Sequence, residues 1–186
     1  YIIVANGIIS PTGYSVAPNF ALNVYAGGRE GTSVEDNTDV LVMHGSPDAP
    51  TVDVVELAVP AGTVVNDISY GSFSNYLELP TSNYVLAIRD QTGANTVATY
   101  AAPLADLFLQ SDAITVLASG FLDPTQNSNG PEFGLWVALA SGGDLIPLPT
   151  APLRTVDFKT STISLYPNPT SNKLFFCSFL QLLYRI

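Results

Sequence analysis

The sequence predicts an all-β protein, an immunoglobulin-like antiparallel β-sandwich, and three observations support this. First, the 186 residues include 14 Gly, 14 Pro, nine Tyr and nine Phe, a composition that favours strands and turns over helices. Second, short apolar runs alternate with turn residues along the chain. Third, part of the sequence repeats itself. Regularly spaced short strands are typical of a sandwich.

Seven apolar runs in the middle of the chain are predicted to be strands, since each is bounded by Gly, Pro, Asn or Ser. Residues 92–95 (Thr-Gly-Ala-Asn) are predicted to form a hairpin turn between two of them. Residues 104–109 follow Pro103 and are predicted to form one or two turns of helix. The predicted strands are 40–44, 52–57, 76–79, 84–89, 96–100, 114–119 and 133–140.

The chain carries an internal repeat with a period of 113 residues. Shifting it by 113 places residues 1–24 on 114–137 without a gap, and eight positions are then identical. They fall on Gly, Pro and alternating apolar positions, which determine turns and strand faces. We therefore expect tandem copies, with residues 1–28 as the last strands of a truncated preceding repeat and 38–149 as a complete one. The identities are Ala5/Ala118, Gly7/Gly120, Pro11/Pro124, Thr12/Thr125, Pro18/Pro131, Phe20/Phe133, Leu22/Leu135 and Val24/Val137.

Residues 29–37 between the two copies are rich in Gly and polar residues, so they are interpreted as a flexible linker. Glu35, Asp36 and Asp39 form an acidic cluster there, and carboxylate oxygens are ligands of Ca²⁺. Their spacing lacks the pattern of a calcium loop, so we favour a solvated linker. A second linker is predicted at 150–161.

The charge balance excludes several kinds of partner. The net charge is −10, with six Lys and Arg in total, too few for binding to nucleic acid or to an anionic membrane. No apolar run reaches the length of a membrane span. With one cysteine, Cys177, and one histidine, His44, an intrachain disulfide and a multi-histidine zinc site are excluded. No catalytic residue, metal ligand or cofactor is predicted.

One motif dominates the complete copy: residues 44–54 read His-Gly-Ser-Pro-Asp-Ala-Pro-Thr-Val-Asp-Val, followed by Tyr-Leu-Glu-Leu-Pro at 76–80 and Tyr-Val-Leu-Ala-Ile at 84–88. It resembles the family called domain of unknown function 4397. The resemblance implies a β-sandwich of secreted bacterial proteins, often in tandem, and implies no activity. The motif residues concerned are His44, Ser46, Pro47, Asp48, Pro50 and Asp53.

The physical properties of these residues favour a structural turn. The two prolines bias the residues before them to extended conformations, and the Asp48 carboxylate is suited to accept backbone N–H bonds in such a turn. Asp53 alternates with Val52 and Val54, so we expect it on the polar face. The alternative is that His44, Asp48 and Asp53 form a catalytic or metal-binding set, which the lack of a second histidine disfavours.

Residues 163–174 read Ile-Ser-Leu-Tyr-Pro-Asn-Pro-Thr-Ser-Asn-Lys-Leu. They resemble the start of the type A C-terminal sorting domain of the bacterial type IX secretion system. This implies export by that machinery to the medium or outer surface of a Gram-negative bacterium. Residues 162–176 are assigned to this domain, as a short C-terminal strand segment. Residues 177–186 depart from its pattern as an apolar tail, which we interpret as a frameshift or premature end. The sorting residues are Leu165, Tyr166, Pro167, Asn168 and Pro169.

These features predict a non-enzymatic secreted or cell-surface module with an adhesion, binding or spacer role. Tyr70 and Phe73 are candidate ligand contacts, because exposed aromatic faces suit sugar rings. The alternative places these repeats as accessories of a secreted hydrolase with its catalytic domain upstream. Carboxylate pairs serve glycoside hydrolysis, but turn or surface roles suffice for the four candidates, Asp48, Asp53, Asp67 and Glu78.

Overall fold

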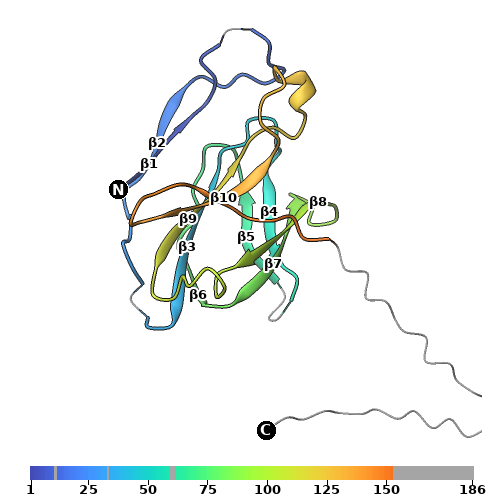
Figure 1. Cartoon of the computed structure of the whole chain (residues 1–186). Coiled ribbons are helices and arrows are strands. Elements are labelled where there is room, and N and C mark those ends of the chain that lie inside the picture. The colour runs from blue at the N-terminus through green and yellow to red at the C-terminus, as the bar shows by residue number, and fades with distance from the viewer. Residues whose placement is uncertain (11, 33, 59–61, 153–186) are drawn as a thin grey trace, which may run out of the picture. The chain divides into compact units, whose positions relative to one another are not determined.

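The computed structural model describes residues 1–10, 12–32, 34–58 and 62–152 (Figure 1). Almost all regular structure in these residues is β, which confirms the predicted fold class. The assignments to 162–176 and 177–186, and most of the linker at 150–161, lie outside the described residues. Within them, no helix is long and apolar enough to cross a membrane.

Two sheets form the sandwich. One has five strands in the order β11-β10-β9-β3-β6, and the other has four in the order β5-β4-β7-β8. All seven predicted strands are confirmed, with ends that differ by at most three residues, and β5 and β11 are additional. The strands are β3 (Asn37–His44), β4 (Val52–Glu56), β5 (Gly62–Ile68), β6 (Leu77–Pro80), β7 (Asn83–Asp90), β8 (Thr96–Pro103), β9 (Ala113–Ser119), β10 (Gly134–Leu139) and β11 (Ile146–Pro147).

The pairing of β3 with β9 is parallel, which departs from the antiparallel prediction. Val42 lies opposite Val116, and the ladder runs from Asp39 and Ala113 to His44 and Ala118. Seven of the eight β3 residues are buried. Parallel pairing is typical of strands that are covered on both faces, and the central position of β3 in its sheet meets that condition.

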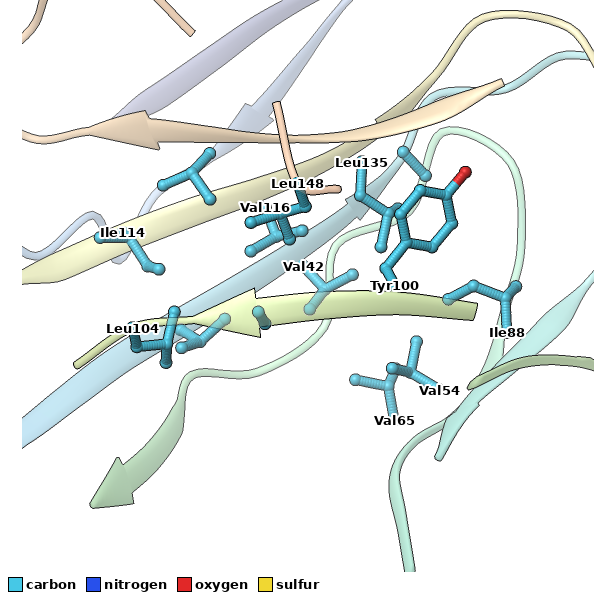
Figure 2. Close-up of a cluster of buried hydrophobic side chains, with 14 of the residues drawn as sticks. Val42, Val54, Val65, Ile88, Tyr100, Leu104, Ile114, Val116, Leu135 and Leu148 are labelled. Carbon is cyan, nitrogen blue, oxygen red and sulfur yellow. The ribbon is translucent and has the colours of Figure 1, made fainter. Parts of the chain in front are cut away.

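The hydrophobic core lies between the two sheets (Figure 2). It forms because alternate residues of each strand point to the same side. Val42 and Val116 come from the five-stranded sheet, and Val54, Ile88 and Tyr100 come from the four-stranded sheet. The segment after β11 closes one side, since Leu148 is 5% exposed and the Ala101 N–H donates to Pro149 O.

The turn between β7 and β8 confirms the predicted hairpin. The Asp90 carboxylate accepts hydrogen bonds from the Thr92 hydroxyl at 2.6 Å and the Asn95 side-chain amide at 2.6 Å. These bonds stabilise the charged form, so they lower the pKa of Asp90 to about 2.

The helix predicted at 104–109 is wrong: the segment forms hydrogen-bonded turns. The Leu107 N–H donates to Pro103 O, as in one helical turn, but Phe108 has a φ of 56°. A left-handed residue ends a helix, and a segment this short does not sustain one. Leu104 and Leu109 still contribute to the core. A short 3₁₀ helix, η1 (Pro124–Gln126), was not predicted.

A separate two-stranded sheet precedes the sandwich in the chain, made by β1 (Ile2–Asn6) and β2 (Ala21–Tyr25). We call these strands and the loop between them the N-terminal hairpin. One face contacts the sandwich, where Asn23 Nδ2 donates to Gly71 O at 2.8 Å. Its loop also bonds to the sandwich, since Ser128 Oγ donates to Gly13 O at 2.7 Å. The opposite face of the hairpin is exposed and apolar.

Candidate functional site

The motif turn connects β3 to β4 and is held by its own polar side chains. Ser46 is fully buried, and its hydroxyl donates to Gly120 O at 2.7 Å. His44 Nε2 lies 3.0 Å from Pro50 O, so this nitrogen carries the proton and donates. The turn is therefore bonded to itself and to the loop between β9 and β10.

Asp48 is the centre of this connection. Its carboxylate accepts from the backbone N–H groups of Leu122 and Asp123, both at 2.9 Å, and from Asn127 Nδ2 at 3.1 Å. The acceptor role matches the interpretation from the sequence, but the donors belong to the loop between β9 and β10. A charged acceptor with two backbone donors is a strong link, so Asp48 joins two distant loops.

Asn127 completes the network, and the sequence analysis missed it. It is 0% exposed and sits between three segments. Its Nδ2 also donates to Asp123 O at 2.8 Å, while its Oδ1 accepts from Ser15 N at 3.1 Å. Because Ser15 lies in the N-terminal hairpin, Asn127 ties that hairpin to the motif turn through Asp48. A single Asn in a loop gave no sequence signal of this role.

Asp53 lies on the face of β4 away from the core, as expected, but that face is covered and the residue is 7% exposed. The side of the strand is therefore as predicted, while the burial of Asp53 was not predicted. The Asp53 carboxylate accepts from the Asp67 backbone N–H at 2.8 Å. Asp53 is buried together with its strand: β4 lies between β5 and β7 in the sheet, and all five of its residues are buried.

His44, Asp48 and Asp53 do not share hydrogen bonds. Each binds a different stretch of backbone: the motif turn, the loop between β9 and β10, and the end of β5. Among the described residues, no group of three or more His, Cys, Asp or Glu is placed to hold a metal ion. The geometry gives these three residues structural contacts.

His44 is buried, with 1% exposure, and its Nδ1 has no hydrogen-bond partner. The His44 and Tyr70 rings are T-shaped relative to each other, with their centroids 6.3 Å apart. Burial disfavours the charged imidazolium and lowers the pKa of His44 below 6.5. The neutral ring is therefore the form that the fold holds.

This burial predicts an acid-sensitive contribution to stability. Unfolding lets His44 bind a proton more readily, so its stabilising effect is full above pH 6.5 and declines as the pH falls below it. The slope from this one group is at most about 1.4 kcal/mol per pH unit. We expect urea denaturation between pH 7.5 and 5 to show a steeper loss for the wild type than for His44→Gln. Parallel curves would show that His44 does not cause the loss.

The acidic residues near the predicted linker bind a basic side chain. Arg29 Nη1 lies 2.5 Å from Asp39 Oδ2 and 2.7 Å from Glu78 Oε1. The Arg29 guanidinium also lies over the Tyr76 ring, 4.7 Å from its centroid. Hydrogen bonds to Glu78 and Asp39 raise the pKa of Arg29. Asp39 therefore pairs with arginine, where the alternative interpretation placed Ca²⁺.

The two candidate ligand aromatics face different neighbours. Tyr70 contacts His44, whereas Phe73 packs against Tyr25 of the hairpin at 5.5 Å between centroids. Tyr76 also meets Tyr25, at 5.8 Å. Tyr70, Phe73 and Tyr76 are all half-buried. Phe73 and Tyr76 thus serve the contact between the hairpin and the sandwich.

A cavity of about 60 Å³ lies between the two sheets, lined almost wholly by apolar side chains such as Val42, Val54 and Leu135. An apolar cavity that admits benzene has a volume of roughly 150 Å³. This space is smaller than such a cavity.

Residues 38–128 match the family model described as Domain of unknown function (DUF4397). The matched range runs from β3 past η1, so it includes the motif turn, Asp48 and Asn127. This match supports the resemblance carried by residues 44–54. No curated protein and no solved structure matches the chain significantly.

Proposed function

We propose that the chain is a non-enzymatic, secreted or cell-surface module of tandem β-sandwich repeats, in which a spacer role is best supported. The observation that carries this proposal is the use of the motif's polar side chains. Ser46 and Asp48 of the motif, together with Asn127 of the loop between β9 and β10, bind loops to one another. A motif whose polar groups are engaged in this way supports a structural role for the domain.

The contacts at the start of the sandwich favour a spacer over a freely jointed array. Arg29 binds Asp39 and Glu78, and the Thr32 N–H donates to Ser111 O at 3.1 Å. The segment interpreted as a flexible linker is thus bonded to the domain that follows it. A spacer gains reach from such a joint, because a stiff connection extends further than a flexible one.

Export through the type IX system is the second part of the proposal, supported by the resemblance of Leu165 to Pro169 to a sorting signal. The full chain, carried to the periplasm of a bacterium with this system, is expected in the medium or on the cell surface. Replacing Tyr166–Pro169 with alanines is expected to retain it in the periplasm. Alanines at 155–158 serve as the control. Equal distribution of the two variants would remove the type IX route.

A glycan array distinguishes a spacer from an adhesin. A spacer is expected to bind no glycan above background. A glycan that binds the parent and is lost in Tyr70→Ala or Phe73→Ala would favour the adhesin, since these aromatics are the candidate sugar contacts.

A further inference from the structure

The N-terminal hairpin and the β9–β10 hairpin have the same register. In the first, Ile3 lies opposite Val24 and Ala5 lies opposite Leu22. In the second, Val116 lies opposite Val137 and Ala118 lies opposite Leu135. Every one of these positions maps onto its counterpart by a shift of 113 residues. The two hairpins therefore present equivalent side chains on equivalent faces.

The turns that leave the first strands also correspond. The Ile8 N–H donates to Pro18 O at 2.8 Å, and the Phe121 N–H donates to Pro131 O at 2.9 Å. Gly7 and Gly120 precede these residues with φ values of 95° and 89°. A Cβ at either would lie within 2.3 Å of a backbone oxygen, so both positions require glycine.

Equivalent positions differ sharply in exposure. Val116, Leu135 and Val137 are 6%, 4% and 0% exposed, because they face the four-stranded sheet. Their counterparts Ile3, Leu22 and Val24 are 61%, 60% and 55% exposed. An apolar strand face of this kind marks an interaction surface. We call it the open face, formed by Ile3, Ala5, Phe20, Leu22 and Val24.

We propose that the open face closes a second sandwich, and that its occupant is a further copy of residues 38–113 placed before Tyr1 in the same chain. The proposal rests on the tandem arrangement proposed above. The occupant follows from the equivalence: Leu135 and Val137 pack with Val42, Val54, Ile88 and Tyr100 in the core, and Leu22 and Val24 occupy the same positions on their hairpin.

The face of the hairpin that contacts the sandwich, which carries Asn23 and Tyr25, defines how consecutive copies meet. Tyr25 packs on Phe73 and Tyr76 of the following copy, and Asn23 bonds to Gly71 O. The hairpin thus belongs to the core of one copy and covers the outer surface of the next. Consecutive copies are then joined by packed sheets as well as by the segment 29–37.

The test is an extended chain in which residues 38–113 directly precede Tyr1, as Ala113 precedes Ile114. The extended chain is compared with the present chain. Both carry Cys177→Ser and Leu22→Cys, so a single thiol reports on the open face. We expect thiol labelling to be at least 100-fold slower in the extended chain. In the same background, Val97→Cys in place of Leu22→Cys is the control, because Val97 is 41% exposed and lies outside this face.

Unchanged labelling of Leu22→Cys, or an added copy that stays unfolded by circular dichroism, would overturn the proposal. A dimer of the present chain that Leu22→Asp abolishes would also overturn it and assign the open face to self-association. A second variant checks the result without a thiol: Leu22→Ala is expected to lower the denaturation midpoint in the extended chain. None of these readouts depends on export, so failure of the type IX route leaves them unaffected.

Discussion

Replacing Leu135 with alanine is expected to destabilise the present chain by about 2–5 kcal/mol, whereas Leu22→Ala changes its stability by less than about 0.5 kcal/mol. Leu135 is 4% exposed in the core between the sheets, and Leu22 is 60% exposed on the open face. Removing a buried leucine loses its transfer free energy and leaves a cavity, while an exposed leucine loses little. Equilibrium urea denaturation of the purified chain measures both.

The variants Leu135→Ala and Leu22→Ala form a matched comparison. Each leucine lies in the second strand of a hairpin and opposite an alanine, Ala118 or Ala5. Differences in strand propensity and in the unfolded chain therefore cancel, and the measured difference reports the surroundings. Equal losses for the two variants would contradict the burial assigned to these positions.

Asp48→Ala is expected to lower the free energy of unfolding by about 2–4 kcal/mol. The change removes the acceptor of the Leu122 and Asp123 N–H groups and of Asn127 Nδ2. Hydrogen bonds to a charged group contribute roughly 1.5–3 kcal/mol each, and losses within one network do not add. The expected loss is therefore less than the sum of three bonds.

Two variants control this prediction. Asp48→Asn keeps the shape and one acceptor oxygen, so we expect it to lose less than Asp48→Ala. Asp106→Ala removes a carboxylate from an exposed position and is expected to be nearly neutral. If Asp48→Ala unfolds at the same denaturant concentration as Asp106→Ala, the carboxylate does not hold the two loops together.

The strands that the sequence predicted correctly have apolar residues that form one run or alternate with polar ones. Val52–Glu56 and Asn83–Asp90 are examples, because both lie in the middle of the four-stranded sheet. The edge strand Gly62–Ile68 was missed. Polar Asn66 and Asp67 interrupt its pattern, and Asp67 has a φ of 50° where the register with β4 shifts. A bulge of this kind breaks the alternation on which the prediction depends.

The candidate site was only partly predictable for a different reason. The type of residue at Asp48 indicated an acceptor of backbone bonds, but its donors are 74 and 75 positions further along the chain. Local sequence carries no information on such a pairing. Asp53 shows the same limit: alternation gave its side of the strand correctly, while its burial depends on what covers that side.

The parallel pairing of β3 with β9 has a consequence for the order of folding. His44 lies opposite Ala118, so β3 cannot gain this neighbour until the chain has grown by 74 residues. At synthesis rates of 5–20 residues per second, this delay is about 4–15 s. During that time the apolar run at 40–43 lacks the partner that covers it in the folded domain. Long-range pairing also slows folding to the millisecond–second range, which lengthens the time for which this run stays uncovered.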